Sequence, residues 1–98
     1  PFGPLVPILT FKTFDEVIER ANDNDLGLCS YLYTNSMDKA HIGSEKLESG
    51  CVAVNTGVVA IAEAPFGGIK QTGYGREGGS GAIKDYLNVK YTHMGLKI

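Results

Sequence analysis

The sequence predicts an α/β fold, with strands and helices in the order βαβαβ and a parallel sheet. Two observations predict it: short apolar runs alternate with amphipathic stretches, and each amphipathic stretch begins at a residue that can cap a helix. Strands that alternate with helices at this spacing are typical of crossovers between parallel strands. The 98 residues, 43% of them hydrophobic, suffice for one small domain with a modest core.

The first predicted strand covers residues 5–11, an apolar run in which Pro7 favours a place at an edge or a strand start. Thr13 and Glu16 then have the spacing of a capping box, which indicates the start of a helix. The apolar face of that helix is predicted to hold Phe14, Val17, Ile18 and Ala21. The turn-forming residues 22–27 should end it.

A second strand is predicted over residues 28–34, where aromatic and aliphatic side chains lie between turn formers. Ser36 is a suitable N-cap for a second helix that runs to about Glu48, and Gly50 occupies the usual stop position. The continuous apolar run 51–55 predicts a third, short strand.

Residues 56–81 form a glycine-rich stretch that is too long for a passive connection. Ordered loops of this length usually carry function or cross between subunits. A short helix is predicted over residues 82–87 and a last strand over 89–94. Because that strand has no local partner, pairing with another chain would satisfy its edge, which favours a homo-oligomer.

Charge and composition bear on the class of partner. The net charge is −2 and no basic stripe is present, so a nucleic-acid partner is not expected. No apolar run approaches the roughly 20 residues of a membrane span, so no membrane partner is expected either.

The chain begins at Pro1 without methionine, which we interpret as a fragment or a cleaved product. Cys29 and Cys51 lie in apolar runs and are interpreted as buried free thiols, which fits a reducing, cytoplasmic location.

Other candidate motifs are weak. Residues 73–78 spell G-x-G-x-x-G, but they follow a polar turn and not a strand, which argues against a dinucleotide-binding loop. Glu63 and Lys70 are interpreted as a surface ion pair more readily than as an acid–base pair. His41 and His93 lack neighbours at ligand spacing, so no metal site is expected.

Several motifs together resemble the C-terminal part of aldehyde dehydrogenases. Phe2-Gly3-Pro4 before an apolar strand resembles the segment of the Glu-x-Phe-Gly-Pro motif, and residues 54–57 and 64–73 resemble the family's C-terminal signature. Residues 75–78, 85–87 and 89–91 resemble its closing segment. The resemblance covers essentially the whole chain, and its endings are most similar to succinate-semialdehyde dehydrogenases.

The resemblance implies oxidation of an aldehyde to its carboxylic acid through a cysteine thioester, with NAD or NADP as hydride acceptor. The catalytic cysteine, the general-base glutamate and the dinucleotide domain lie upstream in such enzymes, so we assign no catalytic residue here and expect the isolated chain to be inactive. Phe2 matches a residue that packs near the nicotinamide. The implied partners are the aldehyde, the remainder of the enzyme chain and other subunits in a dimer or tetramer.

The resemblance also implies a substrate pocket. Phe66 matches an aromatic residue that shapes this pocket, where a rigid ring excludes water from the thioester. Residues 58–62 correspond to the loop at the pocket mouth. Succinate-semialdehyde enzymes often have polar residues near Ala60 and Ile61, whereas these side chains are apolar. The difference leaves room for a less polar aldehyde, or for an upstream arginine that holds the substrate carboxylate.

We therefore expect residues 1–82 to complete a catalytic domain, and residues 83–98 to hold the short helix and an oligomerisation strand. The alternative, from a different class, is a stand-alone binding or assembly module that keeps the fold without the chemistry. Its support is that the chain offers no assigned nucleophile. The presence of Phe2 and Phe66, useful only in a complete active site, favours the enzyme.

Overall fold

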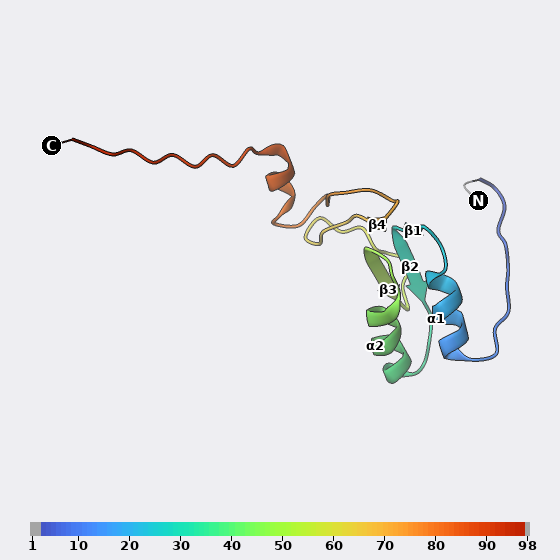
Figure 1. Ribbon diagram of the computed structural model, residues 1–98. Coiled ribbons are helices and arrows are strands. Elements are labelled where there is room, and N and C mark those ends of the chain that lie inside the picture. Colours follow the sequence, from blue (N-terminus) through green and yellow to red (C-terminus); the bar gives the residue numbers. More distant parts are fainter. Residues whose placement is uncertain (1–2, 98) are drawn as a thin grey trace.

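A computed structural model describes residues 3–97, and its packed part is built around one βαβ unit (Figure 1). Strands β2 (Cys29–Leu32) and β3 (Cys51–Val54) pair in parallel, with Cys29 opposite Cys51 and Leu32 opposite Val54. Helix α2 (Met37–Lys46) connects the two strands and packs against both. Helix α1 (Phe14–Asn22) packs beside α2. The predicted parallel pairing of these two strands is confirmed.

Both predicted helix starts are confirmed, because the capping side chains form the expected bonds. The Thr13 hydroxyl accepts a hydrogen bond from the Glu16 backbone N–H at 3.2 Å, and the Ser36 hydroxyl accepts one from Lys39 at 3.3 Å. The reciprocal bond of a capping box is displaced by one residue: the Glu16 carboxylate accepts from the Lys12 N–H at 2.9 Å. These side chains satisfy donors that the first helical turn leaves free.

A second, two-stranded sheet was not predicted. Strand β1 (Leu26–Gly27) pairs antiparallel with β4 (Ile69–Lys70), which lies within the glycine-rich stretch. The Gly27 N–H also donates to the Thr72 hydroxyl at 2.9 Å. A Cβ at Gly27 would lie 2.7 Å from the Glu48 carbonyl oxygen, so only glycine fits this crossing. This second sheet attaches the glycine-rich stretch to the chain segment that precedes β2.

The first and last predicted strands are unpaired within the described part of the chain. Residues 5–11 and 89–94 are extended but pair with no other segment between residues 3 and 97. Ile8 is 86% exposed and Val89 is fully exposed, and Figure 1 shows both ends leaving the packed body. An isolated extended segment has no ladder to complete its backbone hydrogen bonds, so no strand forms. The βαβαβ order is therefore confirmed only for β2–α2–β3.

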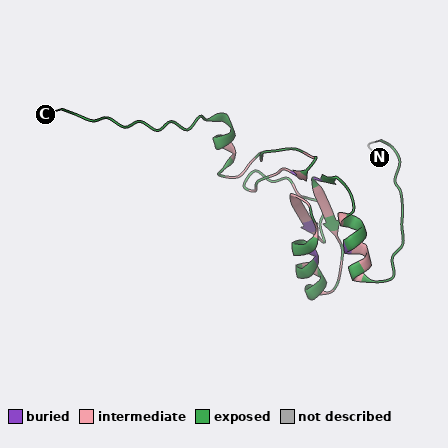
Figure 2. Ribbon diagram, in the orientation of Figure 1, coloured by how far each residue is buried: buried purple, intermediate pink, exposed green. Residues whose placement is uncertain are grey.

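The short helix predicted near the C-terminus is present as the 3₁₀ helix η1 (Ala82–Tyr86). The core is small: Ile18 and Ala53 are the buried hydrophobic residues of the described chain, and exposed side chains cover much of the remainder (Figure 2). None of the helices within residues 3–97 combines the length and apolar character that a membrane crossing requires.

Candidate functional site

Asn55 fixes the point at which the long loop leaves the parallel sheet. Its backbone lies in the left-handed region, with φ of 55°, which asparagine tolerates better than most residues. Its N–H donates to the Leu32 carbonyl at 2.8 Å. Its side-chain amide accepts from the Thr34 N–H at 2.9 Å and donates to the Thr34 carbonyl at 3.0 Å. The loop therefore starts at the carboxyl ends of β2 and β3, where open parallel sheets usually bind ligands.

The loop then folds back on itself through backbone contacts. Phe66 and Glu77 exchange two backbone hydrogen bonds, of 2.7 and 2.8 Å, and the Gly79 N–H donates to the Ala62 carbonyl at 2.9 Å. Gly78 has a φ of +69°, and a Cβ there would lie 2.8 Å from the Ala64 carbonyl oxygen. The close approach and the left-handed backbone together require glycine at position 78.

The structure brings three of the four predicted site residues together. Ala60, Ile61 and Phe66 line one open cavity of about 280 Å³. The remaining lining residues are Ala62, Glu77 and Gly78. The lining includes no cationic side chain, so this cavity by itself offers no partner for a substrate carboxylate. The fourth predicted residue, Phe2, lies outside the described residues.

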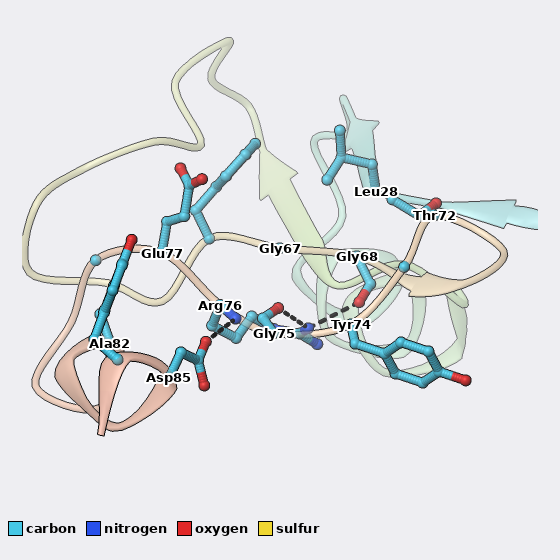
Figure 3. Close-up of a pocket in the computed structure, with 14 residues that line it drawn as sticks. Leu28, Gly67, Gly68, Thr72, Tyr74, Gly75, Arg76, Glu77, Ala82 and Asp85 are labelled. Carbon is cyan, nitrogen blue, oxygen red and sulfur yellow. Dashed lines mark hydrogen bonds between the residues drawn. The ribbon is translucent and has the colours of Figure 1, made fainter. Parts of the chain in front are cut away.

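Arg76 is a structural residue of this region that sequence reasoning did not single out. Its guanidinium donates from Nη1 to the carbonyl oxygens of Gly68 and Gly75, both at 2.8 Å, and its backbone N–H donates to the Asp85 carboxylate at 3.3 Å. Figure 3 shows these bonds beside a cavity of about 600 Å³. They hold the turn after Phe66 against η1. The available signal was that Arg76 is the sole cation between positions 71 and 83.

The G-x-G-x-x-G sequence does not form a dinucleotide cradle. It follows the two-residue strand β4 through a turn, and no α-helix opens after Gly78; the next helical element in the described chain is η1, which begins at Ala82. A pyrophosphate-binding loop requires a helix N-terminus at that point. The residues described here therefore do not fit the nucleotide, and the glycines serve the loop geometry instead.

The suggested pairing of Glu63 with Lys70 is wrong. The Lys70 ammonium forms an ion pair with Glu48 and donates to the carbonyl oxygens of Asn22 at 2.9 Å and Asn24 at 3.1 Å. Lys70 itself has a φ of 56°. These bonds fasten β4 to the end of α1, so the lysine has a structural role.

Neither cysteine lies in the cavity around Phe66, and both are half-buried rather than buried as expected. The pKa of the Cys29 thiol is raised, first by burial and then by the neighbouring Cys51. A raised pKa keeps the thiol protonated at neutral pH, so Cys29 lacks the activation that is typical of a catalytic cysteine. This agrees with the interpretation that the catalytic thiol lies elsewhere.

Comparisons with known proteins identify a family and relatives that are similar to this chain. The profile of the Aldehyde dehydrogenase family matches residues 1–92. The chain is 49% identical to 3-sulfolactaldehyde dehydrogenase of Pseudomonas putida over 96% of its own length and 19% of the relative's. It is 46% identical to succinate-semialdehyde dehydrogenase [NADP(+)] of Escherichia coli, over 97% of its length and 20% of the relative's.

Solved structures agree with these relatives. The NAD+ complex of an aldehyde dehydrogenase from Bacillus cereus superposes with a TM-score of 0.86 at 45% identity, covering 91% of this chain and 18% of that one. The chain thus spans about a fifth of the length of the proteins it matches. On the family match and this similarity, the chain belongs to the aldehyde dehydrogenase family.

Proposed function

We propose that this chain is the C-terminal part of an NAD(P)-dependent aldehyde dehydrogenase, and that residues 56–66 form the mouth of its aldehyde pocket. The observation that carries the proposal is the cavity shared by Ala60, Ile61 and Phe66 beyond the carboxyl end of β3. In this reading residues 1–82 belong to the catalytic domain, and the extended C-terminal segment pairs with another subunit. Phe2 would pack near the nicotinamide.

The proposed substrate is a short aldehyde with an anionic group at its other end, and succinate semialdehyde is the first choice. The relatives are named for succinate semialdehyde and 3-sulfolactaldehyde, which carry a carboxylate and a sulfonate beside the aldehyde. Because the cavity around Ile61 lacks a cation, we assign recognition of the anion to a residue outside this chain. The apolar loop would contact the carbon chain of the substrate.

The contribution of this chain to the reaction is to shape the pocket and exclude water. Two hydrogen bonds to Glu77 hold the backbone that carries the Phe66 ring. A preorganised apolar wall costs little reorganisation and limits premature hydrolysis of a thioester. The nucleophile, the general base and the main nucleotide contacts are assigned to the remainder of the enzyme. The alternative of a stand-alone binding module is not favoured, because the named relatives are dehydrogenases.

The direct test is an assay of the full-length enzyme that contains this segment. Formation of NADH or NADPH is measured with succinate semialdehyde and with butanal, an uncharged aldehyde of the same chain length. We expect turnover of both aldehydes and a kcat/KM at least about tenfold higher for the carboxylate, a difference of about 1.4 kcal/mol in the barrier. A preference for butanal would refute the anionic substrate, and absence of turnover with either aldehyde and either nucleotide would refute the enzyme assignment.

A pair of arginine substitutions tests the place of Ile61 at the pocket mouth. Ile61→Arg puts a cation into the cavity, whereas Ile83→Arg puts the same cation on η1, at a residue that is similarly exposed (60% against 54%). If residue 61 contacts the substrate, only Ile61→Arg changes the ratio of kcat/KM for succinate semialdehyde to that for butanal. Equal ratios in both variants and the wild type would place Ile61 away from the substrate.

A further inference from the structure

Cys29 and Cys51 occupy directly paired positions on neighbouring parallel strands. They are the first residues of β2 and β3, and the Cys51 N–H donates to the Leu28 carbonyl at 3.0 Å. Paired residues of adjacent strands have Cα atoms about 5 Å apart. Disulfides join residues whose Cα atoms are about 4.4–6.8 Å apart. The strand register therefore places the two thiols within reach of a disulfide.

The two side chains lie on the sheet face that the helices leave uncovered. Leu32 faces α2, since a Cβ added to Gly43 would lie 2.5 Å from its Cδ2 atom. Side chains alternate between the two faces of a strand, so Cys29 and Tyr31 point away from the helices. Tyr31 is 50% exposed, and both cysteines are half-buried and reduced. Within this chain the thiols are thus accessible to a small reagent.

The two thiols are also neighbours, and one of them contacts the glycine-rich loop. The pKa of Cys29 is raised by burial, by the charge of Cys51 and by a side-chain hydrogen bond with Cys51. The Cys51 thiol in addition donates to the Gly67 carbonyl, with a sulfur–oxygen distance of 3.7 Å. Gly67 directly follows Phe66 in the chain. Cys51 therefore lies opposite Cys29 and also contacts the backbone that directly follows the pocket aromatic.

We propose that Cys29 and Cys51 form a dithiol site that hydrogen peroxide converts to a disulfide. The Cys51 thiolate attacks peroxide, the O–O bond breaks, and a sulfenic acid forms on Cys51 with release of water after protonation. The second thiol then attacks the sulfenic sulfur, the S–O bond breaks, and a second water leaves. Overall, two thiols lose two protons and two electrons, and one peroxide is reduced to two waters.

Formation of the disulfide turns the Cys51 sulfur toward Cys29 and removes its hydrogen bond to Gly67. The backbone that follows Phe66 then loses one of the hydrogen bonds that hold it in place. Oxidation then loosens the pocket wall without touching the catalytic thiol, a consequence that rests on the proposed function. The site would make pocket order depend on peroxide.

The test uses the full-length enzyme under native conditions. The reduced protein is treated with hydrogen peroxide, remaining thiols are alkylated, and the protein is cleaved after lysine and arginine. Cleavage after Arg20, Lys39, Lys46 and Lys70 releases Cys29 in peptide 21–39 and Cys51 in peptide 47–70. We expect a species with the summed mass of these two peptides minus two hydrogens, which disappears after reduction with dithiothreitol. Recovery of both peptides in alkylated form, or linked to other cysteines, would overturn the proposal.

Two controls make the result specific and independent of enzyme activity. Cys29→Ser and Cys51→Ser each remove one sulfur, so neither variant can give the linked species. The effect on the pocket is read by amide hydrogen exchange over residues 64–68, which we expect to quicken on oxidation of the wild type and to stay unchanged in both variants. Equal exchange before and after formation of the linked species would overturn the coupling to Phe66.

Discussion

The middle of the chain and its two ends all contain apolar segments, but these segments differ in structure. Residues 51–54 form a strand because β2 lies beside them, and α2 covers one face of the pair. Residues 5–11 are mostly apolar and residues 89–94 partly so, yet both segments remain extended and exposed. An apolar run becomes a strand only when a partner completes its backbone hydrogen bonds. The comparison shows that apolar residues alone do not decide which segments form strands.

The largest expected effect is a difference in amide exchange between the ends in two contexts. In the isolated 98-residue chain, amides over 88–96 should exchange with an opening free energy near zero, whereas in the full-length enzyme they should be protected by several kcal/mol. Hydrogen exchange followed by mass spectrometry measures both, with residues 51–54 as the internal standard. Equal protection of residues 88–96 and β3 in the isolated chain would contradict the described difference between the C-terminal end and the middle.

The next largest effect is expected where a glycine in the folded part of the chain lies close to another backbone segment. A Cβ at Gly50 would lie 1.8 Å from the Gly67 carbonyl oxygen, so Gly50→Ala should destabilise the protein by about 3 kcal/mol through overpacking. Gly57→Ala is the matched control, because its added carbon has no neighbour nearer than the Tyr33 hydroxyl at 4.0 Å. Thermal unfolding of the two variants gives the comparison. A smaller loss at position 50 than at 57 would contradict the described contact between β3 and the loop.

The third effect concerns the start of α1, where the folded body meets the N-terminal extended segment. Thr13→Ala removes the hydroxyl that accepts from the Glu16 N–H and should cost about 1 kcal/mol. Thr13→Ser keeps the hydroxyl and should recover most of that loss. Chemical denaturation of both variants measures the difference, and equal losses would show that the cap contributes little.

The smallest effect is a pH dependence at the same helix start. The pKa of Glu16 is lowered, chiefly by the hydrogen bond from the Lys12 N–H and further by the Arg20 side chain. A carboxyl whose pKa is lower in the folded state contributes stability above its unfolded pKa, and that stability is lost as the pH falls through the folded value. Glu16→Gln should therefore flatten the fall of the thermal midpoint in acid. If the thermal midpoint falls equally steeply in acid for Glu16→Gln and the wild type, other carboxyl groups cause the loss of stability.

Local signals made the helices and the middle strands predictable from sequence. The hydroxyls of Thr13 and Ser36 act within three residues, and the run 51–55 pairs with a strand nearby in the sequence. The pairing of β1 with β4 was not predictable, since two-residue strands have no period and the paired residues are 42 and 44 positions apart. The two outer strands stay predictions, because propensity does not reveal whether a partner is present.

The candidate site was predictable only in part. Ala60, Ile61 and Phe66 followed from the family resemblance, and the structure brings them around one cavity. The roles of Arg76 and Asn55 depend on carbonyl and amide groups of distant backbone, for which the side chain alone gives no signal. Whether the cavity binds substrate stays a prediction.

The most direct test of the central claim is the activity of the full-length enzyme with Phe66→Ala, beside the control Tyr74→Ala. Tyr74 is fully exposed and does not line the cavity with Ala60 and Ile61. If residues 56–66 shape the aldehyde pocket, Phe66→Ala should lower kcat/KM for succinate semialdehyde by about tenfold or more, and Tyr74→Ala should leave it nearly unchanged. Equal kcat/KM values for Phe66→Ala and the wild type, with both proteins folded, would contradict the account.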